Sequence, residues 1–180
     1  TVDTERAFLT GYTDLWNFRT NTNSYGWYFG SQGYTVEGSH PSYDWFYNRR
    51  NVNGYLGIPT YYFLENLYSE LSPVTIAPDS ILFQEIYNLY AANRDGAGGP
   101  YFSFNVTYQG HGPYDTEEVW RGDHYTDGRY STETANIVDN YLGSVADTAE
   151  QLAVLVDRLR QEERPVVLVV FGDHKPWLGY

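Results

Sequence analysis

Three short stretches of the chain have the apolar pattern of buried β-strands. Residues 34–37 are the shortest, and residues 102–108 alternate Phe102, Phe104 and Val106 with intervening positions. Residues 165–171 read Pro-Val-Val-Leu-Val-Val-Phe, a continuous and mostly β-branched run. A run of this kind is typical of a strand that is covered on both faces, as in a parallel sheet.

Helical patterns lie between these stretches. Residues 61–71 and 80–92 fit helices, and Asp79 is a suitable N-cap for the second of them. The longest pattern covers residues 133–160, where apolar side chains recur at steps of three and four. Helices that alternate with strands predict an α/β fold, with a mainly parallel sheet flanked by helices.

Length, charge and composition narrow the possible functions. The 180 residues suffice for one domain with a real core, and we find no repeat or long linker that would divide it. The net charge of −12 argues against a nucleic-acid partner, because that binding needs Lys and Arg to neutralise phosphates. The absence of cysteine excludes thiol catalysis, thiolate metal ligands and disulfides. The 19 Tyr and 5 Trp fit either a Tyr-rich core or a site for sugars and lipid headgroups.

Three of the four histidines follow the predicted strands within a few residues. These are His40, His111 and His174, and each comes shortly after a glycine. Ligands of parallel sheets bind at the carboxyl ends of the strands, so we expect these three side chains at one edge of the sheet. The fourth, His124, stands in a polar loop, although residues 122–124 repeat the Gly-Asp-His of residues 172–174. We therefore assign His124 to the surface or to the rim of a pocket.

The pair Asp173-His174 suits a divalent metal. A carboxylate oxygen and an imidazole nitrogen are ligands that zinc and manganese accept, although two ligands do not complete a site. The same pair can also act as general acid and base.

An anion site is a second possibility, near His40. Arg49 and Arg50 are adjacent there, and arginine presents a planar fork that matches phosphate or sulfate; two solvated arginines are the alternative. Thr1 opens a helix, where its hydroxyl could cap the backbone amides or act as a nucleophile toward an anion.

Four blocks of the sequence together resemble the lipoteichoic acid synthase and phosphoglycerol transferase group, which has a sulfatase domain and belongs to the alkaline phosphatase superfamily. The first is Thr-Val-Asp-Thr-Glu at residues 1–5, which resembles the Thr-x-x-x-Glu nucleophile motif. The others, in the family's order, are residues 32–49, residues 105–114 and the closing Val-Val-Phe-Gly-Asp-His at residues 169–174. The resemblance covers nearly the whole chain.

The resemblance implies a role for each site residue. Thr1 would be the nucleophile and a metal ligand, and Asp173 and His174 would be the other metal ligands. The metal would be manganese in the first instance, with magnesium, zinc or calcium as alternatives. The expected substrate-binding residues are His40, Tyr47, Arg49 and His111. Tyr47 stands where the family usually has tryptophan in the headgroup pocket.

Two departures from the family pattern qualify what the resemblance implies. The family can carry an acidic residue two places after the first histidine, but this chain has Ser42 there, with Asp44 as a candidate substitute. The headgroup is therefore left open. The remaining acidic metal ligand of the family lies upstream of the nucleophile. We accordingly expect residues 1–180 to be a fragment of a single catalytic domain, incomplete at both ends, that turns over little substrate by itself.

The expected function is metal-dependent transfer of phosphoglycerol from an anionic lipid headgroup donor to a glycan or polyol acceptor, through a phospho-threonine. The enzyme would be extracytoplasmic, in the cell envelope, and anchored to the membrane through a segment absent from this chain. Hydrolysis by a sulfatase-like or phosphodiesterase relative is one alternative, although sulfatases normally use a modified Cys or Ser where this chain has Thr1. A non-catalytic domain that binds sugars or headgroups is another alternative.

Overall fold

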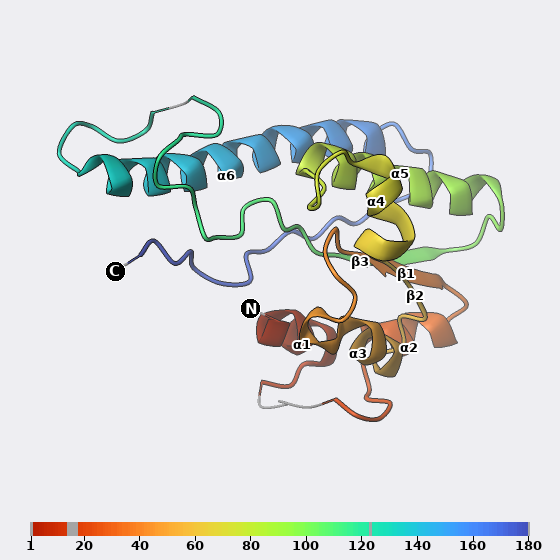
Figure 1. Ribbon diagram of the computed structural model, residues 1–180. Coiled ribbons are helices and arrows are strands. Elements are labelled where there is room, and N and C mark those ends of the chain that lie inside the picture. The colour runs from red at the N-terminus through yellow and green to blue at the C-terminus, as the bar shows by residue number, and fades with distance from the viewer. Residues whose placement is uncertain (1, 14–17, 123, 180) are drawn as a thin grey trace. The chain divides into compact units, whose positions relative to one another are not determined.

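The computed structural model describes residues 2–13, 18–122 and 124–179 (Figure 1). The chain divides into two compact units. Unit 1 comprises Thr1–Tyr108 and Val169–His174, and unit 2 comprises Gln109–Leu168 and Lys175–Tyr180.

Unit 1 is built on a parallel sheet of three strands. The strands are β1 (Thr35–Ser39), β2 (Thr60–Tyr62) and β3 (Tyr101–Asn105), in the order β2-β1-β3. At the centre, Gly38 has no room for a side chain, because a Cβ there would lie 2.2 Å from the Phe104 carbonyl oxygen and 2.4 Å from the Tyr61 ring. The predicted parallel sheet is confirmed, although β2 was missed because its residues fall at the edge of the predicted helix 61–71.

The helices of unit 1 flank this sheet. They are α1 (Val2–Thr10), α2 (Tyr25–Ser31), α3 (Arg49–Tyr55), α4 (Ser69–Leu71) and α5 (Asp79–Asp95), with short helical turns at Phe46–Asn48 and Leu64–Tyr68. The predictions of a helix at the start of the chain and of one over residues 80–92 are confirmed by α1 and α5. The α/β class with a small parallel sheet flanked by helices is therefore confirmed.

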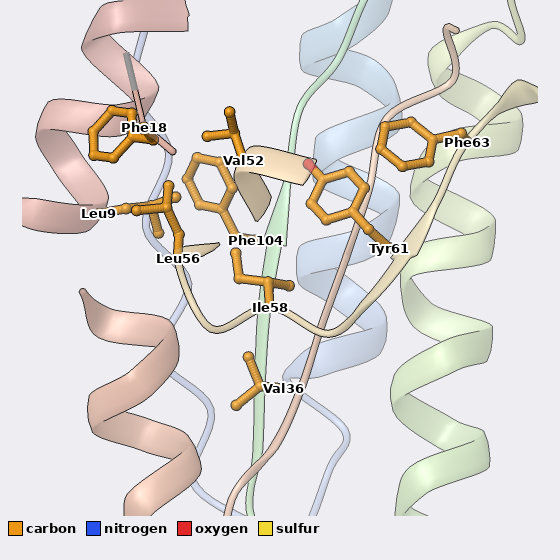
Figure 2. Packing of buried hydrophobic residues seen from close by; sticks show 9 residues of the cluster. All are labelled: Leu9, Phe18, Val36, Val52, Leu56, Ile58, Tyr61, Phe63 and Phe104. Carbon is orange, nitrogen blue, oxygen red and sulfur yellow. The ribbon is translucent and has the colours of Figure 1, made fainter. Parts of the chain in front are cut away.

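Two apolar clusters cover the sheet of unit 1. The larger is drawn in Figure 2 and contains Leu9, Phe18, Val36, Val52, Leu56, Ile58, Tyr61, Phe63 and Phe104. The smaller contains Leu64, Tyr68, Ala77 and Leu82, with Tyr62 packed against it. Because Tyr61 and Tyr62 are successive strand residues, they point to opposite faces of the sheet, so each face has its own cluster.

Unit 2 is organised by one long helix, α6 (Thr132–Leu159), which confirms the pattern over residues 133–160. Its N-cap is Ser131, whose side chain accepts a hydrogen bond from the Thr134 backbone N–H. Asn140 on α6 donates to the carbonyls of Asp115 and Glu118 at 3.0 and 2.8 Å, and so fixes the preceding loop on the helix. Over the described ranges, none of the helices has the length and apolar character needed to cross a membrane.

The strand predicted at residues 165–171 is wrong for this structure. The segment forms neither helix nor strand, and its side chains are mostly exposed, with Val167 at 88%. A β-branched run becomes a strand only beside another strand that takes up its backbone hydrogen bonds. Within the described part of the chain, the sheet pairs only β1, β2 and β3, so this run has no such neighbour.

Candidate active site

The first turn of α1 lies beside the end of the chain's last apolar run. Thr4 Oγ1 donates a hydrogen bond of 2.7 Å to the backbone carbonyl of Asp173, 169 residues away in the sequence. One turn further along α1, the Phe8 ring stacks on Phe171 with 4.6 Å between centroids. Thr1 itself lies outside the described residues. The structure thus brings the residues that follow Thr1 to the Asp173-His174 pair.

The side chains of Asp173 and His174 are close enough to bind the same metal ion. His174 Nε2 lies 3.6 Å from Asp173 Oδ2, and both side chains are 37% exposed. Two ligands that each bind zinc at about 2.0–2.2 Å with a tetrahedral angle lie about 3.3–3.6 Å apart, so the donor set fits half of a site. No cluster of three or more acidic or histidine ligands occurs among the residues that the structure places.

Arg49 is buried and paired with Glu5 of the Thr-x-x-x-Glu segment. Arg49 Nη2 donates to Glu5 Oε1 at 2.8 Å, and Nη1 donates to Oε2. Burial lowers the pKa of Arg49, but the hydrogen bond and charge of Glu5 outweigh this effect and hold the pKa above its ordinary value. The pair also lines a cavity of about 10 Å³ together with Arg6 and Asn53. That volume holds about one water molecule and is too small for a phosphate.

Tyr47 and Asn48, which precede Arg49, have an unusual backbone. Their φ angles are 54° and 55°, in the left-handed region that non-glycine residues rarely adopt. This turn directs the Tyr47 carbonyl to Arg6 Nη2 at 2.9 Å and leaves the Tyr47 ring 5.9 Å from the Arg49 guanidinium carbon. The ring is 51% exposed. Strain of about 1–3 kcal/mol per residue persists only where the surroundings enforce it, and it often marks functional sites.

His40 immediately follows β1, at the carboxyl edge of the sheet, where the sequence places it. The side chain is 1% exposed, and Nδ1 lies 3.0 Å from the Val106 carbonyl oxygen. Because a carbonyl oxygen only accepts hydrogen bonds, Nδ1 must carry the proton. The ring also meets Tyr108 edge-on at 5.4 Å. The imidazole is therefore held in one tautomer and one orientation.

The second arginine and the acidic candidate beside it form their own ion pair. Arg50 pairs with Asp44, whose side chain is only 9% exposed, and the Asp44 backbone N–H donates to Glu65 Oε2 at 3.2 Å. Ser42 is buried as well. Arg49 is buried in its pair with Glu5, whereas Arg50 is 70% exposed beside Asp44, so only the second arginine is solvated.

The remaining two histidines belong to unit 2. His111 is exposed, and its Nδ1 donates to the Gly112 carbonyl at 2.5 Å. Its role in substrate binding stays a prediction. The side chain of His124 is 68% exposed, which agrees with the surface position expected from its polar loop.

Asp139 on α6 holds the loop that contains His124. Its buried carboxylate accepts from the backbone N–H groups of Tyr125 and Thr126, both at 2.9 Å, and lies 3.2 Å from His124 Nδ1. Burial raises the pKa of Asp139, but these hydrogen bonds outweigh it and leave the pKa below its ordinary value. Little in the sequence indicates this role, because Asp139 lies within a regular helical pattern.

Replacing Asp139 with alanine should lower the free energy of unfolding by about 2–4 kcal/mol, because two partly buried backbone N–H groups lose their charged acceptor. A group whose pKa falls on folding stabilises the protein above its unfolded-state pKa of about 3.9 and ceases to do so as the pH falls through its folded-state value. The difference between the native chain and Asp139→Ala should therefore shrink below about pH 4. Urea unfolding at pH 7 and pH 3 measures it, and an equal difference at both would contradict the charged role.

Comparison with known proteins identifies the family. A model of the sulfatase family matches residues 1–180. The chain belongs to this family and so to the alkaline phosphatase superfamily, which confirms the class that its four sequence blocks indicated.

The individual proteins that the chain resembles share at most 27% of its residues. A Rhizobium meliloti (strain 1021) protein named for cyclic beta-1,2-glucan modification is 27% identical over 99% of the chain, which spans 29% of that protein. Among solved structures, lipoteichoic acid synthase LtaP from Listeria monocytogenes has a TM-score of 0.70 at 16% identity, over 88% of the chain and 39% of its own. Streptococcus pyogenes phosphoglycerol transferase GacH, in complex with sn-glycerol-1-phosphate, has a TM-score of 0.67 at 17% identity, over 90% and 45%. At these identities the structures establish the fold alone.

Proposed function

We propose that the chain is the metal-binding core of a phosphoglycerol transferase of the cell envelope. One observation carries the proposal: the Thr4–Asp173 hydrogen bond of 2.7 Å, which lies between the nucleophile segment and the metal-ligand pair. In a transferase the nucleophile must lie beside the metal, and these two segments are remote in sequence but adjacent in space.

In this mechanism the Thr1 oxygen attacks the phosphorus of the lipid donor. A bond forms between Thr1 Oγ and phosphorus, and the bond from phosphorus to the diacylglycerol oxygen breaks, which leaves phosphoglycerol on Thr1. The Thr1 proton is lost to a base, and the departing oxygen gains one. An acceptor hydroxyl then attacks the same phosphorus, the bond to Thr1 Oγ breaks, and the proton of the acceptor replaces the one that Thr1 lost. A divalent ion held by Asp173 and His174 would supply Lewis-acid stabilisation of the hydroxyl and of the phosphoryl charge.

The remaining site residues bind and orient the phosphate. Glu5 engages two of the five N–H donors of Arg49 and holds the guanidinium rigidly. Because the cavity beside the pair holds only about one water, a phosphate oxygen would reach Arg49 only after the pair rearranges. His40 has a fixed imidazole, and His111 is proposed as a further donor. Tyr47 is proposed to line the headgroup pocket with its exposed ring. Such prearranged donors favour the transition state because they need no reorganisation during the reaction.

The acceptor is proposed to be a glucan or related glycan. The name of the Rhizobium meliloti relative supports a glucan, and the ligand in the GacH structure supports glycerol phosphate as the transferred group. An extracytoplasmic location at the membrane is proposed as well, because the proposed donor is a membrane lipid and the proposed acceptor is a glycan.

The test is an assay of the full-length protein with a fluorescent phosphatidylglycerol, Mn²⁺ and a β-1,2-glucan, followed by mass spectrometry of the glucan. We expect the glucan to gain phosphoglycerol units, and we expect a chelator to abolish the gain. Free glycerol phosphate in place of modified glucan would favour the hydrolase instead. Absence of any metal-dependent product from the lipid would contradict both readings.

A further inference from the structure

The segment before α2 and the first turn of that helix enclose a shallow depression on unit 1. It has a volume of about 140 Å³ and is lined by Asn21, Thr22, Asn23 and Trp27. This space exceeds the roughly 10–15 Å³ that one water needs but is smaller than the roughly 300 Å³ of common small-molecule pockets. A single sugar ring is of this scale.

Trp27 is held rigidly in the wall of the depression. Its indole Nε1 donates to the Tyr55 carbonyl at 2.9 Å. The ring packs against the backbone of Gly57, where a Cβ would lie 2.8 Å from two of its atoms and where the φ angle is +73°. Even so, Trp27 is 43% exposed. An aromatic ring that is fixed at its edge yet open to solvent is a platform for stacking.

The opposite wall is anchored at the same point. The Thr22 backbone N–H donates to the Tyr55 carbonyl at 3.0 Å, so one carbonyl oxygen joins the two walls. Ser24 Oγ, between them in sequence, donates to the Leu56 carbonyl at 2.5 Å. Because both walls are fixed before any ligand arrives, binding would cost little conformational entropy.

The chemistry of the lining selects a neutral, polyhydroxylated ligand. Asn21 and Asn23 each offer amide donors and a carbonyl acceptor, which match adjacent hydroxyl groups of a sugar. The four described lining residues include no charged side chain, so no ion pair with a phosphate headgroup could form with them. The Trp27 indole can cover the apolar C–H face of a pyranose ring.

From this arrangement we propose that the depression binds a hexose unit of a neutral glycan, with Trp27 as the stacking platform and Asn21 and Asn23 as hydroxyl partners. The proposal concerns binding alone and does not depend on phosphoglycerol transfer. If the transfer reaction also holds, the depression would be a docking point for the acceptor glycan.

The experiment titrates the chain with a linear β-1,2-linked glucooligosaccharide, with neither metal nor lipid present, using calorimetry and tryptophan fluorescence. We expect saturable binding that Trp27→Ala weakens at least about tenfold, or about 1.4 kcal/mol, while Trp27→Phe retains most of the affinity. Trp120, which is 57% exposed and lies in unit 2, provides the matched control, and Trp120→Ala should bind as the native chain does.

Because Trp27 also packs on Gly57, its replacement could disturb the fold, so a second variant tests the site without changing Trp27. Asn21→Ala combined with Asn23→Ala changes only exposed side chains and should weaken binding while the thermal unfolding midpoint stays unchanged. No saturable binding by the native chain, or equal binding by the native chain and a folded Trp27→Ala, would overturn the proposal. Because metal and donor are absent from this titration, neither result decides the outcome of the phosphoglycerol transfer assay.

Discussion

Replacing Arg49 with alanine should lower the free energy of unfolding by about 3–5 kcal/mol, because it leaves the buried carboxylate of Glu5 without its partner. Both side chains of the pair are less than 10% exposed, at 7% and 8%. Glu5→Ala should cost a similar amount by stranding the guanidinium. Arg49→Lys keeps the charge but loses the two-pronged contact, so its cost should be smaller yet clear. Urea unfolding of the chain at pH 7 measures each value.

Two controls separate burial from charge. Arg129 and Asp127 form an exposed pair, with side chains at 79% and 55%, so Arg129→Ala should change the free energy by less than about 1 kcal/mol. Replacing both members of the buried pair with apolar residues, as in Glu5→Leu with Arg49→Met, should recover much of the loss, because no charge then remains buried. A cost below about 1 kcal/mol for Arg49→Ala alone would show that the ion pair is not buried as described.

The pairing of Glu5 with Arg49 could not be predicted from the sequence. The Thr-x-x-x-Glu segment and the segment that contains Arg49 were both recognised, and Arg49 was assigned to anion binding because arginine matches phosphate. Sequence cannot show that a carboxylate 44 positions earlier meets the same guanidinium. The pairing depends on how α1 and α3 pack, which is a tertiary property.

Features that depend on neighbouring residues in the sequence were predicted correctly. The long helix α6 was predicted from apolar spacing, and the position of His40 after β1 was predicted from the apolar stretch that precedes it. The strand predicted at residues 165–171 is wrong because its formation depends on a non-local partner. Its composition favours a strand, but strand formation also requires a neighbour with free hydrogen-bonding groups, and no composition supplies one.

The convergence of three histidines at one sheet edge was predicted from the alternation of strands and loops. His40 lies at that edge, whereas residues 165–171, which should have carried His174 there as a strand, do not join the sheet. Asp173 is instead attached to α1 through Thr4. The link between α1 and the Asp173-His174 pair therefore comes from a side-chain hydrogen bond that no periodicity could reveal.

In the full-length enzyme, Asp173→Ala and His174→Ala should each reduce metal-dependent turnover by more than about a hundredfold. Changes in residues that merely support metal ligands typically cost 10–100-fold, so the loss of a ligand should exceed that range. The fold should survive, because both side chains are 37% exposed and neither belongs to the apolar clusters. Mn²⁺ binding by calorimetry, turnover of the phosphatidylglycerol analogue and circular dichroism test the three parts of the expectation.

The second Gly-Asp-His of the chain provides the matched control for this experiment. His124 is 68% exposed and contacts only Asp139 among the ion pairs of the described residues, so His124→Ala should leave turnover nearly unchanged. Full activity in Asp173→Ala or His174→Ala would exclude them as ligands. A large loss in His124→Ala, with normal activity in the other two, would instead move the metal site to the loop held by Asp139. The two tripeptides share their residue types, so this comparison isolates the effect of their positions in the fold.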